Sequence, residues 1–300
     1  MKKKTYLFAL MAMVLTLGSC SDNENGIGGE TSKYITVSTS IGNMTRVATD
    51  AKGGQTFEEG DEISVYAWTG ASTVAPETSE RVVNNAINKL TNGSWVSTPQ
   101  MLWKNNRDKH YFIGVYPTAA ISDLSAGEYT FDANKQTESD LLVAVNPDGL
   151  SYSADAQQTV PLTFTHVMAK LAVNLTYKNQ WGGIPTVEKV VVGNAAKEAT
   201  INYLTKVVTP STTAKEDFSL PEITENTKYV SVIIPQEDVK QLTIVIGGKN
   251  FVYDNGTPFK LESGKITTVN LEVGRDEIKL GDVKITNWED GSTFSGEALN

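Results

Sequence analysis

The side chains that most often perform catalysis are few and scattered in this chain. Its two histidines, His110 and His166, stand outside any metal-binding or nucleophile-activating motif. Two acidic pairs, Glu58-Glu59 and Glu289-Asp290, could in principle act on a sugar as glycosidase carboxylates do. Each pair lies beside a glycine in a predicted turn, where exposed acids are common. The residues therefore predict a protein that is not an enzyme, without catalytic residues, metal site or cofactor, and a structural, packed His166.

One residue has surroundings that predict a covalent modification: Cys20, the only cysteine. Three lysines at residues 2–4 precede an apolar run at residues 6–17, which is typical of a signal peptide over residues 1–19. The run is too short for a membrane-spanning helix, which needs about 20 residues. Leu17-Gly18-Ser19-Cys20 resembles the bacterial lipobox, in which cleavage precedes an acylated cysteine. We expect Cys20 to be lipidated; the alternative is an ordinary cleavage site with an incidental thiol.

Composition narrows the classes of partner. The formal net charge is −9, and the charged residues are scattered rather than grouped. An acidic chain of this kind is a poor ligand for nucleic acid or for an anionic membrane surface. With its one cysteine lipidated, the chain has no thiol for a disulfide, so its stability must come from packing. Its length suffices for two domains with cores of their own.

The elements expected to position these residues are β-strands. Residues 20–33 are polar and Gly-rich and predict a flexible tether. From residue 34 onward apolar residues alternate with polar ones, as half-buried strands require, and turn signals separate the runs. This pattern predicts an all-β chain of antiparallel sandwiches. The runs are 34–41, 63–67, 111–115, 141–145, 160–164, 171–177, 187–192, 229–234, 242–246, 251–253, 269–273 and 283–285.

The alternation changes parity once. Val160, Leu162 and Phe164 are apolar on even numbers, whereas Leu171 and Val173 are apolar on odd numbers. Such a change requires a bulge, a corner or a new strand. We therefore expect a domain boundary near residue 160, within about ten residues, which gives domains at 34–160 and 161–300. Residues 84–90 could form a short helix, although the neighbouring β-branched residues fit a strand equally well.

Several stretches, in this order, resemble the fimbrillin family of Bacteroidales fimbrial lipoproteins. No stretch is specific alone, and the resemblance rests on their order and on the leader. Besides the lipobox leader they are Met44-Thr45-Arg46-Val47, Phe57-Glu58-Glu59-Gly60-Asp61-Glu62-Ile63, the run from Leu162 to Leu171, Val232-Ile233-Ile234-Pro235-Gln236, the run from Leu261 to Val269, and Asn287-Trp288-Glu289-Asp290-Gly291.

This resemblance implies two tandem transthyretin-like β-sandwich domains after the signal peptide. It also implies a lipid-anchored protein of the outer-membrane surface whose partners are other fimbrial subunits. In the family, an arginine-specific protease cuts the loop after the first strand, and subunits then polymerise by donor-strand exchange. A host or bacterial surface ligand could follow from a role in adhesion.

The first strand suits such a mechanism. Ile35, Val37, Thr39 and Ile41 share one side of the predicted strand at 34–41 and could fill pockets in a sheet. If the strand were excised, a strand from another subunit could refill the groove, gaining main-chain hydrogen bonds. The following residues 42–50 are small and polar, as in exposed loops where proteolysis is easiest. The resemblance makes Arg46-Val47 the candidate cleavage site; the alternative is a surface arginine of no consequence.

The donor strand is less defined. In stalk subunits of the family it comes from the C-terminal tail, where Ile278, Leu280, Val283 and Ile285 could supply anchors. The alternative is that these residues form the last strand of the second domain, which would suit a tip or accessory subunit.

A second hypothesis is a monomeric, lipid-anchored adhesin or glycan-binding protein that keeps its first strand. Aromatic rings stack on sugars, so this hypothesis requires a solvent-facing aromatic platform. The candidates are the five tryptophans, Trp68, Trp95, Trp103, Trp181 and Trp288.

Overall fold

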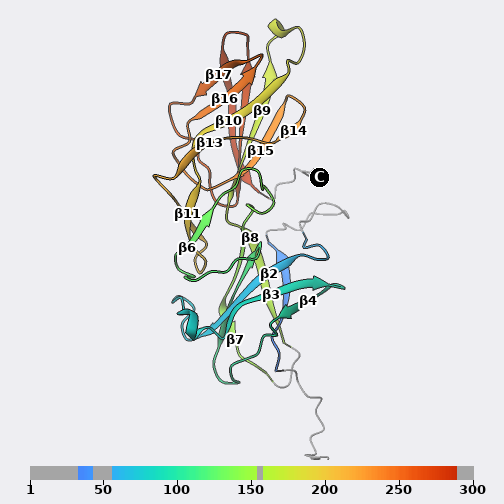
Figure 1. The fold of residues 1–300 in the computed structure, drawn as a ribbon, viewed down its shortest axis with the longest axis vertical. Helices are drawn as coiled ribbons and strands as arrows, with labels where there is room; N and C mark the ends of the chain where they lie inside the picture. Colours follow the sequence, from blue (N-terminus) through green and yellow to red (C-terminus); the bar gives the residue numbers. More distant parts are fainter. Residues whose placement is uncertain (1–32, 43–55, 154–157, 289–300) are drawn as a thin grey trace, which may run out of the picture.

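The computed structural model describes residues 33–42, 56–153 and 158–288. Its regular structure consists of nineteen strands and two single-turn 3-10 helices, η1 (Thr78–Glu80) and η2 (Asn179–Trp181). The predicted all-β class is confirmed. The molecule is elongated, with the earlier strands at one end and the later strands at the other (Figure 1). Neither described helix is long and apolar enough to cross a membrane.

Seven strands form the sheet of the first half. Its order is β1-β8-β7-β5-β2-β3-β4, and only the β1–β8 pair is parallel. Residues 84–90 lie in strand β3 (Val83–Thr91) rather than in a helix. The chain turns at Asn92-Gly93, where both φ angles are positive, and β4 (Ser94–Thr98) then pairs antiparallel with β3. The strands are β1 (Thr36–Ile41), β8 (Thr159–His166), β7 (Leu142–Leu150), β5 (His110–Tyr116), β2 (Glu62–Thr69), β3 (Val83–Thr91) and β4 (Ser94–Thr98).

The seven-stranded sheet is buried on both faces in its centre. In β2, Val65 belongs to an apolar cluster that also contains Val37 of β1 and the preceding Ile35, whereas Tyr66 and Trp68 join a second cluster on the opposite face. Successive side chains of a strand point to opposite faces, so β2 supplies both clusters. β1 covers only the first.

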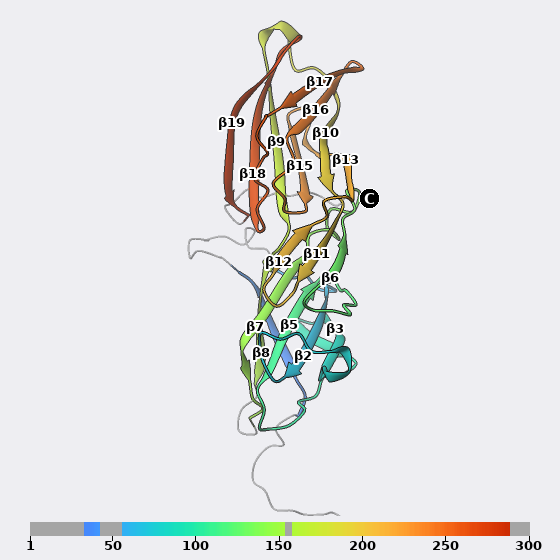
Figure 2. The same ribbon diagram turned by 90° about the vertical axis from the view of Figure 1, so that its left-hand side faces the viewer.

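Two facing sheets form the second half (Figure 2). The five-stranded sheet has the order β14-β15-β9-β18-β19, and the four-stranded sheet has the order β13-β10-β16-β17. Their strands are β14 (Glu222–Thr224), β15 (Lys228–Ile233), β9 (Ala169–Tyr177), β18 (Lys265–Val273) and β19 (Ile278–Asn287), and β13 (Lys215–Ser219), β10 (Val187–Ala196), β16 (Gln241–Ile246) and β17 (Lys249–Asp254). Val173, Leu271 and Ile244 are buried between them, as a sandwich requires.

A third sheet joins the two halves. It has the order β12-β11-β6, where β6 (Gly127–Thr130) comes from the first half and β11 (Glu198–Asn202) and β12 (Val207–Pro210) come from the second. Beside it, the side chain of Gln136 accepts a hydrogen bond from the backbone N of Val232 at 2.7 Å. The second apolar cluster runs without interruption from Tyr66 and Trp68 into the second half.

The chain passes from the seven-stranded to the five-stranded sheet between His166 and Ala169. The parity change falls at the same place: Val160, Leu162 and Phe164 are buried before it, and Leu171 and Val173 are buried after it. We infer that the boundary between the proposed domains lies at residues 167–168, although β6 pairs across it.

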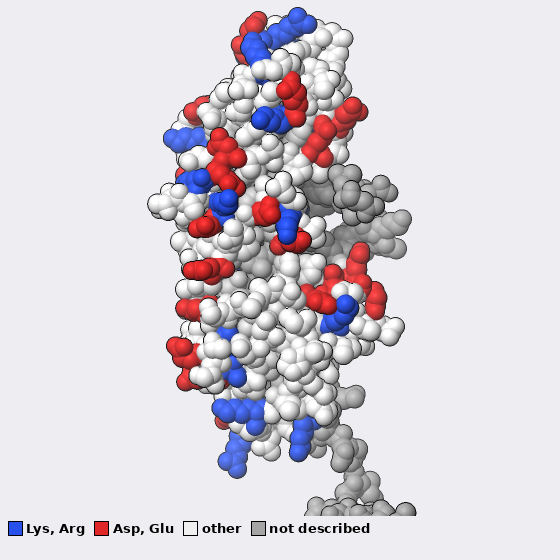
Figure 3. Space-filling view, viewed as in Figure 1, with Lys and Arg blue, Asp and Glu red and all other residues white. Residues whose placement is uncertain are grey.

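Charges of both signs are scattered over the face seen in Figure 3, with wide uncharged areas between them.

Candidate functional site: the first strand and its groove

β1 lies at the edge of the seven-stranded sheet. Its residues pair in register with β8, from Thr36 opposite Thr159 to Ile41 opposite Phe164. Ile35 and Val37 point into the core and are buried, while Thr39 and Ile41 on the same side are half-buried. All four residues predicted to fill a groove therefore face the sheet, and the residues between them are exposed.

The backbone of β1 forms a full ladder of hydrogen bonds with one strand, β8. Gly42 N donates to Phe164 O at 2.8 Å, so the even-numbered residues turn their backbone groups toward β8. The odd-numbered residues turn theirs the other way, where Ile35 N donates to Met101 O at 2.9 Å and Trp103 N donates to Lys33 O at 3.2 Å. Apart from these contacts at the N-terminal end of β1, no backbone pairing between β1 and β4 is present among the described strands.

β8 depends on β1 for most of its backbone pairing. Residues 159–164 pair with β1, whereas pairing with β7 covers only residues 164–166. Pro161 lies in the part that pairs with β1 alone. Because Phe164 O faces β1, the even-numbered residues of β8 turn their backbone groups toward β1 and the odd-numbered residues turn theirs away. The missing N–H of Pro161 therefore lies on the side away from β1, and the proline leaves the β1 ladder intact. Without β1, residues 159–163 would become an unpaired edge.

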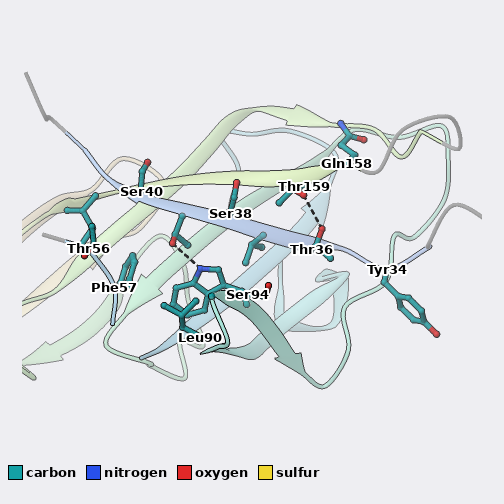
Figure 4. A pocket seen from close by; sticks show the side chains of 15 residues that line it. Tyr34, Thr36, Ser38, Ser40, Thr56, Phe57, Leu90, Ser94, Gln158 and Thr159 are labelled. Carbon is teal, nitrogen blue, oxygen red and sulfur yellow. Dashed lines mark hydrogen bonds between the residues drawn. The ribbon is translucent and has the colours of Figure 1, made fainter. Parts of the chain in front are cut away.

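Between β1 and β4 the sheet leaves an open seam, with a cavity of about 780 Å³ (Figure 4). Trp95 of β4 reaches across it and donates from Nε1 to Thr39 Oγ1 at 2.9 Å. Phe57 closes the inner side, with ring centroids 5.3 Å from Trp95 and 5.1 Å from Phe164. Among the described residues the lining carries no charged side chain; it consists of Tyr34, Thr36, Val37, Ser38, Thr39, Ser40, Ile41, Thr56, Phe57, Leu90, Gly93, Ser94, Trp95, Gln158 and Thr159.

Sequence reasoning missed these partners of β1. Trp95, Phe57 and Met101 carry no local signal of contact with residues 35–41, because the contact depends on curling of the whole sheet. Phe164 could have been found: the run 160–164 has the same period as 35–41, and both runs are short and half-buried.

The tail residues proposed as donors lie in β19, which pairs antiparallel with β18. These residues thus form the last strand of the second half in this structure, which is the alternative considered from the sequence. Leu280, Val283 and Ile285 are 38%, 37% and 41% exposed, although they share a side with buried partners in β18. The three-residue step from Leu280 to Val283 breaks strict alternation, and a bulge at Gly281 restores it.

The end of β19 is fixed at the boundary of the two halves. Trp288 is 6% exposed and stacks on His166, with ring centroids 4.2 Å apart and planes 9° apart. His166 Nδ1 lies 2.8 Å from Asp140 Oδ1. The Nζ of Lys170 lies 4.1 Å from the centre of the Trp288 ring. His166 is therefore packed, as predicted from its position.

The remaining chemical candidates are in structural contacts. His110 is fully buried; its Nε2 accepts from Lys104 N at 3.0 Å, and burial lowers its pKa. Glu59 accepts a 2.7 Å hydrogen bond from Asn92 N and so caps the β3–β4 turn. Within the described ranges, no three His, Cys, Asp or Glu side chains come together as metal ligands would. Cys20, Arg46, Val47 and the pair Glu289-Asp290 lie outside the described residues.

None of the five tryptophans, all of them in described residues, is exposed. Trp68 and Trp288 are buried, and Trp95, Trp103 and Trp181 are half-buried. Trp103 contacts the rings of His110 and Phe112, and Trp181 contacts Phe251. Trp95 lines the cavity between β1 and β4, and the five tryptophans do not form an exposed aromatic platform.

Comparisons with known proteins agree with this architecture. Residues 45–288 match the Fimbrillin-like family, a match that begins after β1. Among solved structures, a proposed cell adhesion protein from Bacteroides uniformis has a TM-score of 0.63 at 18% identity, covering 85% of this chain and 98% of that one. A fimbrial protein from Bacteroides vulgatus has a TM-score of 0.53 at 13% identity and covers 86% and 100%.

The tip fimbrial protein Mfa3 from Porphyromonas gingivalis, with a C-terminal truncation, has a TM-score of 0.50 at 12% identity and covers 77% and 95%. At such identities these likenesses concern the fold. The comparison with curated proteins returned no match. Because the family match covers most of the chain, this protein belongs to the Fimbrillin-like family.

Proposed function

We propose that this protein is a structural or accessory subunit of a cell-surface fimbria that supports adhesion. In this proposal it reaches the outer membrane as a lipoprotein acylated on Cys20. A protease cuts after Arg46, β1 leaves with the lipid, and a strand of another subunit takes its place.

One observation carries the proposal: β1 fills a groove but is attached as an edge strand. Val37 of β1 and the preceding Ile35 are buried, yet only β8 forms a full ladder with the strand. Burying an aliphatic side chain is worth roughly 1.5–3 kcal/mol gross. A cut in the loop alone would therefore leave β1 seated, and its departure would require a competing strand that restores the same burial. Cleavage and exchange are separate steps in this scheme.

The incoming strand must meet definite conditions. It must be extended, uncharged where it faces the seam, and apolar at alternate positions, because the described residues that line the cavity carry no charge. β19 carries Val283 and Ile285 two residues apart, as Ile35 and Val37 are. The bulge at Gly281 changes the parity of the apolar residues, so the residues before it and those after it cannot both match a groove for a regular strand. Of the two parts, the one with Val283 and Ile285 lies nearer the C-terminus.

The test is processing followed by assembly of the full mature chain. We expect the uncut protein to stay monomeric and to form polymers, visible by electron microscopy and by size-exclusion chromatography, after cleavage at Arg46. Arg46→Ala should block both events, whereas Arg107→Ala, which removes an exposed arginine elsewhere, should block neither. Polymers formed by Arg46→Ala as readily as by the parent protein would contradict the proposal.

The alternative of a monomeric glycan-binding adhesin receives less support. It requires exposed aromatic side chains, whereas two of the tryptophans are buried and the other three are half-buried. A glycan array with the uncut protein discriminates the two: sugar binding by a protein that never polymerises would favour the adhesin.

A further inference from the structure

The C-terminal strand presents two contrasting environments. Along β19, Leu280, Val283 and Ile285 are more than a third exposed, whereas Trp288 directly beyond it is buried. β17 of the four-stranded sheet approaches β19, yet it leaves these three side chains at that exposure. The strand is thus weakly covered along its length and buried at its end.

The seat of Trp288 is built from both halves of the molecule. His166 is the last residue of β8 in the seven-stranded sheet, and Lys170 belongs to β9 in the five-stranded sheet. The indole stacks on the imidazole and lies under the Lys170 ammonium, an arrangement that combines ring stacking with a cation–π contact. Asp140, from the segment before β7, holds His166 through Nδ1.

The backbone fastens the same point. Trp288 N donates to Gly264 O at 3.1 Å, and Gly264 N donates to Met168 O at 2.8 Å. Gly264 has φ +66°, and a side chain there would meet His166 O at 3.1 Å, so the close approach depends on glycine. A chain of contacts therefore runs from the linker at residues 167–168 through Gly264 to the tail.

We infer that Trp288 is the anchor that keeps β19 on its own subunit, and that its exit from the seat between His166 and Lys170 controls release of the tail. The role of the released tail rests on the proposed function, in which β19 is the candidate donor. The partner that competes for the tail is the open groove of a second subunit. Once Trp288 leaves its seat, β19 keeps its ladder with β18, side-chain hydrogen bonds from Asn270 and Lys265 of β18, and its contact with β17. Burial lowers the pKa of Lys170 and Asp140 opposes this, as expected for a cation held in a closed seat.

Hydrogen exchange of the uncut monomer tests the anchor without requiring assembly. In Trp288→Ala we expect the amides of residues 278–287 to exchange about tenfold faster or more, while those of β15 keep the parent rates. Trp288→Phe should recover part of the protection because a ring still stacks on His166. Ile223→Ala, which removes an exposed side chain from the opposite edge strand β14, should leave β19 unchanged.

Two results would overturn the inference: unchanged exchange in β19, or an equal rise in β15, which would make Trp288 a general core residue. If Trp288→Ala fails to fold, Lys170→Met gives the same test. We then expect a smaller acceleration of amide exchange that is confined to β19. A uniform acceleration of exchange over all strands would contradict the anchor. Assembly of the same cleaved variants separates the two proposals. Faster exchange in β19 with unchanged polymer formation supports the anchor and removes β19 as the donor.

Discussion

At the scale of single residues, the groove of β1 is specified by contacts that local pattern does not reveal. Ile35 and Val37 are recognisable from alternation alone, since their period of two matches their burial. Trp95 and Thr39 are 56 positions apart, and their hydrogen bond exists only because the sheet curls until its edges meet. Physical pattern thus identified the inserted side chains of β1 and left their partners undetermined.

The Trp95–Thr39 hydrogen bond can be measured by a double-mutant cycle. Trp95→Phe and Thr39→Val each remove one partner, and their coupling in the free energy of unfolding should be about 1 kcal/mol. The check is chemical denaturation of the parent, both single variants and the double variant. Additive effects would mean that the bond contributes nothing and that Phe57 packing alone holds Trp95.

Alkaline pH should destabilise the protein through buried tyrosines. Burial raises the pKa of Tyr203 to about 12. Because the folded-state pKa exceeds the ordinary value of 10.0, this contribution is complete below pH 10 and is lost as pH rises toward 12. The free energy of unfolding should therefore fall above pH 10, and it should fall less steeply in Tyr203→Phe. Parallel pH profiles for the two proteins would contradict this assignment.

At the scale of elements, most strands with clear apolar alternation were predictable, whereas strands with a weak pattern were not. Strands β9, β10, β16 and β18 follow apolar periodicity, whereas β4, β6 and β11–β14 are short and carry a weak pattern. The parallel partnership of β1 with β8 joins residues 123 positions apart. Pairing at that distance depends on topology, which alternation does not encode.

A protein that begins at Val47 should bind a peptide with the sequence of residues 34–41. The peptide restores burial of Ile35 and Val37 and the ladder on β8, so it should raise the melting temperature of the truncated protein. Val37→Asp in the peptide should abolish the effect because this side chain is buried. The matched Ser38→Asp should retain it because Ser38 is exposed. Equal behaviour of both peptides would show that the groove does not select inward side chains.

At the scale of the whole molecule, the two halves are joined more tightly than a division of the sequence suggests. β6 precedes residue 160 yet pairs with β11, and one apolar cluster spans both halves. The parity change at residues 164–171 coincides with the change of sheet between β8 and β9, but it carried no information about the shared third sheet. Such sharing favours a single cooperative unfolding transition.

Gly127 in β6 offers a test of that joint. A Cβ at this position would lie 2.5 Å from the ring of Tyr203. Gly127→Ala should therefore lower the free energy of unfolding by about 1–3 kcal/mol through overpacking. Its exposed neighbour serves as control, since Glu128→Ala should change stability by less than about 0.5 kcal/mol. Equal effects of both variants in denaturant titrations would show that the joint is loosely packed.

The most direct test of the central claim, that β1 is a removable strand, is the N-terminus of the native protein sheared from the cell surface, determined by mass spectrometry. Our account predicts a chain that begins at Val47, without Cys20 and without β1. A chain that begins only at acylated Cys20, with β1 retained, would contradict it.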